Sequence, residues 1–266
     1  MLNLGIVPAR LDFTYGFRSY WDDESPIDSY PRFFLDNHSA SATLQQRVSQ
    51  KTKFRCPDHH GIYELLPYGS LNLIMQRYFQ PSARVQSTAE KLLEKYAIDI
   101  NQLVSICYRG TDKGTEVRLA DPEEYIAAAK SIVKPGMKVL IQTDQLQVRE
   151  QMLKSIPGSF YFEEMPVTSG TKVIHQLATE DLGQSRMQFS DHLLAVSWIL
   201  SQSQTLVTHS GNMALWICLF RGHNRSIIQF DKNGVRVGPR QRLSGRVKSL
   251  LREAKRILKG ELTSYT

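Results

Sequence analysis

The segment from Arg109 to Glu116 concentrates groups that bind anions and move protons. Its residues, Arg-Gly-Thr-Asp-Lys-Gly-Thr-Glu, comprise two cations, two carboxylates, two hydroxyls and two glycines. Arg109 can form paired hydrogen bonds with phosphate oxygens, and Lys113 adds a point charge. The glycines let backbone amides approach an anion, but their spacing differs from that of a P-loop. The segment therefore predicts phosphate binding outside the P-loop class, with a salt-bridged surface loop as the alternative.

A second candidate anion site is the turn at residues 208–212, Thr-His-Ser-Gly-Asn. It lies between an apolar run typical of a strand and the run Met213–Phe220, which is typical of a buried helix. The free amides and the dipole at a helix N-terminus favour a bound anion. Ser210 is also a residue type that caps helices, and this purely structural role is the alternative.

Strand and helix patterns alternate regularly between residues 101 and 239. Short apolar, β-prone runs predict strands at 103–108, 138–142, 160–162, 205–208 and 226–230. Helical patterns predict helices between them at 121–133, 144–156, 190–201 and 211–220. This alternation predicts an α/β fold built on a parallel, Rossmann-like sheet. Ligands bind at the carboxyl ends of such strands, where segments 109–116, 143–144 and 209–212 lie.

The chain before residue 101 is expected to form a smaller N-terminal lobe. Aromatic residues and prolines are frequent in residues 1–60, where the one clear strand prediction is Arg32–Leu35. A helix is predicted at Ser70–Tyr78. Another is predicted from a capping box at Ser87 and Glu90 to about residue 96.

The net charge of +7 belongs almost entirely to the C-terminal tail. Residues 240–266 hold eight basic and two acidic residues, a net +6, which leaves +1 for residues 1–239. A nucleic-acid partner is therefore not expected, although the pI is near 9.3. Apolar residues from Leu243 to Leu258 recur at helical spacing between arginines and lysines, which predicts a basic amphipathic helix. Its two candidate roles are peripheral contact with an anionic membrane and packing across both lobes.

The composition, 41% hydrophobic and 22% charged in 266 residues, is that of a folded cytoplasmic protein. No apolar run approaches the roughly 20 residues of a membrane span, and the N-terminus lacks a signal-peptide pattern. Three widely separated cysteines, Cys56, Cys107 and Cys218, indicate a reducing compartment, and the last two are expected in the core. His59 and His60 lie near Cys56, but the further ligands of a zinc site are missing, so no metal site is predicted.

The residues from Cys107 to Glu116, followed by Asp121–Tyr125, resemble the first signature of the α-1,6-fucosyltransferase family. Members of that family are core-fucosylating enzymes of animals and rhizobial Nod-factor enzymes. Their signature reads roughly H-V-R-R-T-D-K-V-G-T-E and then P-x-E-E-Y. The resemblance extends over roughly half of the chain and takes in residues 74–84, 140–144, 200–202 and 206–210.

This resemblance implies a glycosyltransferase of the GT-B type, with two Rossmann-like lobes and a cleft between them. Residues 1–100 would be the acceptor-side lobe and residues 101–239 the domain that binds the nucleotide sugar. The implied reaction transfers fucose from GDP-fucose, with inversion, to a hydroxyl of a glycan or a lipid-linked glycan. It needs neither a metal ion nor a cofactor.

The resemblance also implies roles for individual residues. Arg109 would bind the β-phosphate, Lys113 would assist the departing diphosphate, and Glu116 would be the general base. A carboxylate is required there because the acceptor hydroxyl loses its proton as the new C–O bond forms. The remaining donor-binding residues would be Thr111, Asp112, Tyr125, Thr143, Asp144, His209, Ser210, Gly211 and Asn212.

Five departures from the family pattern bear on the donor. Cys107 stands for the histidine of the signature, Gly110 for its second arginine and Gln145 for the second aspartate of a Thr-Asp-Asp strand end. One residue is missing after Lys113, and Val196 stands where the family reads guanine with an acidic side chain. Two alternatives therefore remain open. One is a different nucleotide sugar, and the other is a non-catalytic Rossmann-like module that binds a nucleotide or nucleic acid.

Overall fold

The computed structural model describes residues 30–35, 60–111, 114, 117–169, 172–174, 177 and 179–237. Asp112, Lys113 and Glu116 lie outside these residues, as do most of residues 1–60 and the whole helix predicted for 240–266. The division of the chain at residues 100 and 239 therefore stays a prediction.

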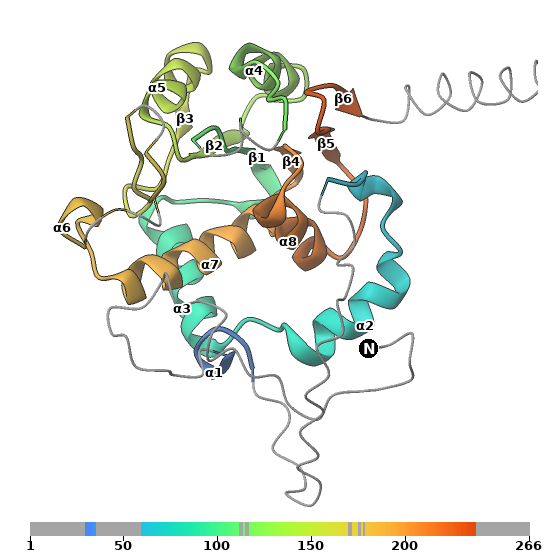
Figure 1. Cartoon of the computed structure of the whole chain (residues 1–266), viewed down its shortest axis with the longest axis vertical. Coiled ribbons are helices and arrows are strands. Elements are labelled where there is room, and N and C mark those ends of the chain that lie inside the picture. The colour runs from blue at the N-terminus through green and yellow to red at the C-terminus, as the bar shows by residue number, and fades with distance from the viewer. Residues whose placement is uncertain are drawn as a thin grey trace, which may run out of the picture.

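A six-stranded sheet lies at the centre of the described part of the chain (Figure 1). Its strands are β1 Leu103–Tyr108, β2 Lys138–Thr143, β3 Ser159–Phe160, β4 Thr205–Thr208, β5 Ile227–Phe230 and β6 Arg236–Val237. All neighbouring strands are parallel except β5 and β6. The prediction of an α/β fold on a mostly parallel sheet is confirmed, and β6 is an antiparallel edge strand that the sequence did not indicate.

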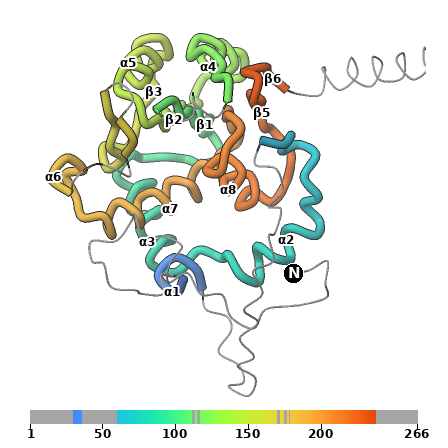
Figure 2. The backbone as a smooth tube through the Cα atoms, viewed as in Figure 1, coloured from blue at the N-terminus to red at the C-terminus, as the bar shows by residue number. Residues whose placement is uncertain are grey.

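Helices cover both faces of this sheet (Figures 1 and 2). They are α1 Tyr30–Phe33, α2 Tyr68–Tyr78, α3 Ala83–Lys95, α4 Pro122–Lys130, α5 Leu146–Ser155, α6 Thr179–Leu182, α7 Arg186–Gln202 and α8 Asn212–Arg221. Short 3-10 helices occupy Tyr63–Leu65 and Ile100–Gln102. Within these described segments, no helix is both long enough and apolar enough to cross a membrane.

Strand β1 joins the two hydrophobic cores of the protein. All of its side chains are buried. Leu103 and Cys107 belong to the core beneath α3, α7 and α8, whereas Val104 and Ile106 belong to the core beneath α4 and α5. A parallel strand buried on both faces reads as a continuous apolar run instead of an alternating one, which is why the sequence pattern identified it.

The strand order β3-β2-β1-β4-β5-β6 places a reversal of direction between β1 and β4. From β1 the chain proceeds through α4 to β2, and from β4 it proceeds through α8 to β5 on the opposite side. In doubly wound sheets the connections diverge at such a reversal and leave a crevice at the carboxyl ends of the strands. The candidate site must therefore be sought after Tyr108 and Thr208.

Three helix boundaries differ from the sequence prediction for reasons visible in the packing. Residues 32–35 do not form a strand: α1 includes Phe33, and Phe34 makes only an isolated bridge with Pro81. Helix α3 begins after Ser82, whose hydroxyl accepts a hydrogen bond from the Val85 amide, and not at residue 87. Helix α7 begins earlier than residue 190, because a capping box formed by residues 185 and 188 starts it.

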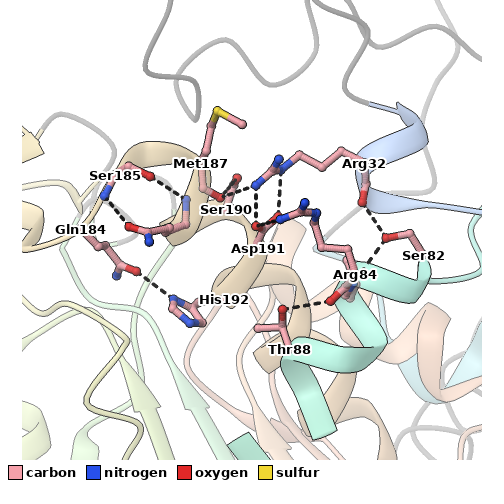
Figure 3. Close-up of polar contacts among 12 residues, drawn as sticks. Arg32, Ser82, Arg84, Thr88, Gln184, Ser185, Met187, Ser190, Asp191 and His192 are labelled. Atoms are coloured by element: carbon pink, nitrogen blue, oxygen red, sulfur yellow. Dashed lines mark hydrogen bonds and ion pairs between the residues drawn. The ribbon is translucent and has the colours of Figure 1, made fainter. Parts of the chain in front are cut away.

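A carboxylate on α7 holds α1 and α3 against α7 (Figure 3). Asp191 accepts a hydrogen bond from Nε of Arg32 at 2.9 Å and lies 3.5 Å from the guanidinium of Arg84. The Ser82 hydroxyl adds a 2.6 Å hydrogen bond to the carbonyl oxygen of Arg32. The described residues before 101 and those of α7 and α8 also share one hydrophobic core. These contacts explain why Ser82, rather than Ser87, begins α3.

A buried arginine at the end of α8 holds the connection between α7 and β4. The Arg221 side chain donates hydrogen bonds to the carbonyl oxygens of Ser201, Ser203, Gln204 and Arg225, at 2.6–3.1 Å. Buried carbonyl groups need such partners, because a buried polar group without a hydrogen bond is costly. Arg221 therefore fixes the position of the backbone just before β4.

We expect Arg221→Met to lower the free energy of unfolding by about 3 kcal/mol, because it leaves buried carbonyl oxygens without donors. Chemical denaturation monitored by circular dichroism measures this change. Arg225→Ala is the matched control: its side chain is exposed and only its carbonyl takes part, so a change within about 0.5 kcal/mol is expected. Equal losses in both variants would contradict the assigned role of Arg221.

Candidate functional site

The three polar segments predicted to form a site meet at one edge of the sheet. Tyr108, the last residue of β1, is in register with Thr143, the last residue of β2. On the other side of β1, Cys107 is in register with Thr208, the last residue of β4. Arg109, Asp144 and His209 are the residues that follow these strand ends. The sequence analysis therefore placed these segments at the correct edge.

The Asp144 carboxylate organises the start of the loop that follows β1. Its Oδ1 accepts a hydrogen bond from the Gly110 amide at 2.9 Å. Its Oδ2 accepts one from the Thr111 hydroxyl at 2.7 Å and lies 3.3 Å from Nε of Arg109. The carboxylate is almost fully buried, and its own backbone carbonyl accepts a hydrogen bond from the Thr168 amide at 2.9 Å. Asp144 thus positions the loop, and Thr111 faces Asp144.

Arg109 is held at the carboxyl end of β1 by this carboxylate. Its side chain is 26% exposed, whereas that of Asp144 is 6% exposed. The contact with Asp144 is made by Nε, and it therefore orients the plane of the Arg109 guanidinium. A partly exposed, oriented guanidinium at a strand end is suited to forked hydrogen bonding with phosphate oxygens.

The far end of the loop is anchored to the edge of the sheet. The amide of Arg118 donates a 3.0 Å hydrogen bond to the carbonyl oxygen of Lys232. Gly234 has φ of +69°, and a Cβ atom there would lie 3.0 Å from the Ala120 amide nitrogen. A glycine is therefore required at 234 for this close approach. Asp112, Lys113 and Glu116, which the sequence analysis singled out, lie outside the described residues, so their roles stay predictions.

Cys107 is a core residue and not a proton donor or acceptor for the site. It is fully buried, and burial raises the pKa of its thiol to about 12. At neutral pH the thiol is therefore protonated. Cys218 is also buried and free, as the sequence analysis expected for both residues.

Tyr125 supports the loop from within the core. Its ring is fully buried, edge-on to Tyr108 at 5.0 Å between centroids and 4.3 Å from the ring of Phe230. Burial raises the pKa of its hydroxyl well above the ordinary value. In this arrangement Tyr125 shapes the floor beneath the loop, and its ring does not reach the surface of the crevice.

The turn after β4 differs in detail from its prediction. Ser210 does not cap α8: its hydroxyl donates to the carbonyl oxygen of Phe230 at 3.3 Å and accepts from Nε2 of Gln229 at 2.8 Å. The N-cap residue is Gly211, whose backbone is extended and offers no capping side chain. His209 is buried, with Nδ1 3.2 Å from the carbonyl oxygen of Cys107. Asn212 is exposed at the first turn of α8.

Tyr63, which the sequence analysis did not identify, fixes the N-terminus of α8. Its hydroxyl accepts a hydrogen bond from the Gly211 amide at 2.7 Å and donates one to the Gly211 carbonyl oxygen at 2.9 Å. Burial raises the pKa of this hydroxyl, so it keeps its proton. The Tyr63 amide in turn donates to Oε1 of Gln229 at 2.9 Å, which links it to Ser210. The start of α8 is thereby held rigidly beside the end of β1.

Within the described ranges, no group of three or more histidine, cysteine, aspartate or glutamate side chains is placed to hold a metal ion. The groups that the described site offers to a ligand are Arg109, the backbone amides at the start of α8 and the polar side chains around them. Each of these favours an anion.

We expect Tyr63→Phe to lower the free energy of unfolding by about 1–2 kcal/mol, because it leaves the buried Gly211 amide without an acceptor. It also removes one of two hydrogen bonds to the Gly211 carbonyl oxygen, which keeps the bond from the Leu215 amide. Chemical denaturation measures the change. Tyr161→Phe is the control, because its ring lies 4.1 Å from the Arg149 guanidinium and no described residue bonds its hydroxyl. A Tyr63→Phe protein as stable as Tyr161→Phe would show that the pair of hydrogen bonds is dispensable.

Comparisons with known proteins give a general likeness only. No protein-family model and no curated protein matches the chain. Among solved structures it is similar to the NodZ α-1,6-fucosyltransferase co-crystallised with GDP, with 16% identity and a TM-score of 0.41 over 62% of this chain and 50% of that chain. The same enzyme soaked with GDP-fucose gives 16% identity and a TM-score of 0.42 over 62% and 51%.

The fucosyltransferase NodZ from Bradyrhizobium gives 15% identity and a TM-score of 0.40 over 62% of this chain and 50% of that chain. The chain thus spans about half the length of these structures. The likeness is a coarse one of fold, and it identifies neither a substrate nor a reaction for this chain.

Proposed function

We propose that this protein is a glycosyltransferase that moves a sugar from a nucleotide sugar to a hydroxyl of an acceptor glycan. The observation that carries the proposal is the position of Arg109. Arg109 directly follows β1, at the point where the strand order reverses, and Asp144 orients its side chain. The neighbouring strand β4 leads into the N-terminus of α8. Crevices at this position in open α/β sheets are where ligands bind.

The chemistry of a departing nucleoside diphosphate fits this arrangement. Breaking the bond between sugar and phosphate leaves negative charge on phosphate oxygens. A guanidinium held by a buried carboxylate can stabilise that charge without reorganising, and so can the amides of the first turn of α8, whose N-cap Gly211 is held by Tyr63. Arg109 and the start of α8 therefore would bind the diphosphate from opposite sides of the crevice, with Lys113 as a second cation.

The other half of the reaction needs a base. The acceptor hydroxyl must lose its proton as it attacks the sugar, and a carboxylate on the side opposite the diphosphate accepts it. Glu116 holds that role in the proposal, in a segment anchored by Asp144 at one end and by the amide of Arg118 at the other. Attack opposite the leaving group gives inversion, and the two cations make a metal ion unnecessary.

The sequence resemblance implies GDP-fucose as the donor. The nucleobase is the part of this donor for which the chain offers the fewest matching residues. Val196, which stands where the resemblance expects a guanine-reading acid, lies on the buried face of α7, and its side chain is fully enclosed in the core. No ligand can reach it there. In the proposal, a residue other than Val196 recognises the guanine base. A lipid-linked glycan as acceptor, with residues 240–266 touching a membrane, belongs to the same proposal.

Binding tests the diphosphate site. We expect GDP to bind and to stabilise the protein in a thermal-shift assay, and Arg109→Ala to weaken binding by about tenfold to a hundredfold, the worth of a charge-assisted hydrogen bond. Isothermal titration calorimetry measures the affinity. Arg118→Ala is the matched control, since that exposed arginine is joined to the body through its backbone amide. If UDP binds in place of GDP, the donor is assigned as a UDP-sugar. If neither nucleotide binds, the proposal is refuted.

Transfer tests the assignment as an enzyme. We expect Glu116→Gln to lower the transfer rate by about a hundredfold or more while leaving GDP affinity unchanged, because the amide cannot accept the proton. Glu150→Gln on the exposed face of α5 is the control and should keep full activity. A wild-type chain that binds GDP but transfers no sugar to any acceptor glycan would support the alternative, a nucleotide-binding module without catalysis.

A further inference from the structure

The side chain of Gln145 covers Gly110 at the carboxyl ends of β1 and β2. A Cβ atom built on Gly110 would lie 2.2 Å from Oε1 and 2.6 Å from Cδ of Gln145, and 2.8 Å from Cε1 of Tyr108. These distances are shorter than any real contact, so no side chain fits at 110 while Gln145 keeps its place. A side chain at 110 would therefore displace the Gln145 amide, whereas the φ angle of Gly110 lies in a region open to other residues.

The two positions are the ones at which the loop departs from the Arg-Arg and Thr-Asp-Asp patterns that it otherwise resembles. An arginine at 110 and an aspartate at 145 would bring opposite charges to this point. Glycine and glutamine replace them with one neutral amide, which lies over Gly110. The net charge of the pair is zero in either case. The two departures are thus one coupled feature of this chain.

The Gln145 amide is placed to meet a ligand. Gln145 is half-buried at the carboxyl end of β2, and its backbone amide donates to the Thr143 hydroxyl at 3.2 Å. No described residue hydrogen-bonds its side-chain amide, which carries two donors and an acceptor. The neighbouring Asp144 carboxylate, in contrast, is already engaged by three donors of the loop. Gln145 is therefore the group that remains available at the end of β2.

In dinucleotide-binding sheets of this strand order, the polar residue at the end of the second strand bonds a ribose hydroxyl, while the phosphates lie at the switch point. Here the switch point holds Arg109 and the start of α8, and β2 lies on the far side of β1. A nucleoside diphosphate bound at Arg109 would extend over the end of β2. A neutral amide suits a ribose diol there, because it can both donate and accept without repelling the diphosphate.

We propose that Gln145 is a specificity residue that hydrogen-bonds the ribose diol of the bound nucleotide, and that Gly110 exists to seat its amide. The inference rests on the proposed function, since it places a nucleoside diphosphate in the crevice. The end of β2 would then recognise the ribose of the ligand. One contact, between Gln145 and Gly110, would account for two departures from the signature.

The test compares GDP with 2′,3′-dideoxy-GDP by isothermal titration calorimetry. The wild-type protein should bind GDP about threefold to tenfold more tightly, the range of one or two neutral hydrogen bonds. Gln145→Ala should lose this preference, because it should lower the affinity for GDP and leave the affinity for dideoxy-GDP unchanged. Gln147→Ala, exposed on the same helix, should keep the preference. If the thermal-shift screen favours UDP, UDP and dideoxy-UDP are the pair to compare.

Gly110→Ala is the second variant, because its Cβ displaces the Gln145 amide without removing it. It should also abolish the preference for the ribose diol. A preference that survives in Gln145→Ala or in Gly110→Ala, or an equal loss of affinity for both nucleotides, would overturn the inference while leaving the diphosphate site intact. Failure of the wild-type protein to bind GDP or UDP would instead overturn the proposed function and this inference with it.

Discussion

The site depends on one buried carboxylate. Asp144 leaves the end of β2 and takes hydrogen bonds from three successive residues of the neighbouring loop: Arg109, Gly110 and Thr111. These bonds fix the start of the loop, because both the Gly110 amide and the Thr111 hydroxyl donate to the same buried carboxylate. The same contact sets the guanidinium at the crevice and leaves Gln145 as the group facing outward. A buried charge is stable only when it is paired and hydrogen-bonded, so the loop and the carboxylate stabilise each other.

The other part of the candidate site, the start of α8, is held by neutral hydrogen bonds. Tyr63 holds both polar groups of the Gly211 backbone, and Gln229 connects Tyr63 to Ser210. The result is a helix N-terminus whose position relative to β1 is fixed before any ligand arrives. A fixed cation on one side and fixed amides on the other form a preorganised environment for a diphosphate. This also explains why the body of the protein needs little net charge: the +7 of the chain lies mainly in residues 240–266, away from these groups in sequence.

The elements that sequence patterns predicted well are those determined by local chemistry. The buried strands β1, β2 and β4 are continuous apolar runs, and α4 begins where Asp121 caps the Glu123 amide as expected. The polar segments that follow these strands therefore lie together, as predicted, at the carboxyl ends of β1, β2 and β4. Contacts between distant residues could not be predicted. Tyr63 and Gly211 are 148 positions apart, and the bond from Ser82 to the Arg32 carbonyl, rather than any local signal, distinguishes Ser82 from Ser87 as a cap. Likewise, Asp144 was recognised as polar at a strand end, but its partners could be found only in three dimensions.

The central claim is that a nucleoside diphosphate lies between Arg109 and the start of α8. A crystal structure of the protein soaked with GDP tests this most directly. The account predicts phosphate oxygens within hydrogen-bond distance of the Arg109 guanidinium and of the first backbone amides of α8, with the ribose over Gln145 at the end of β2. A diphosphate bound at another part of the molecule, with no phosphate oxygen near the Arg109 guanidinium, would contradict it.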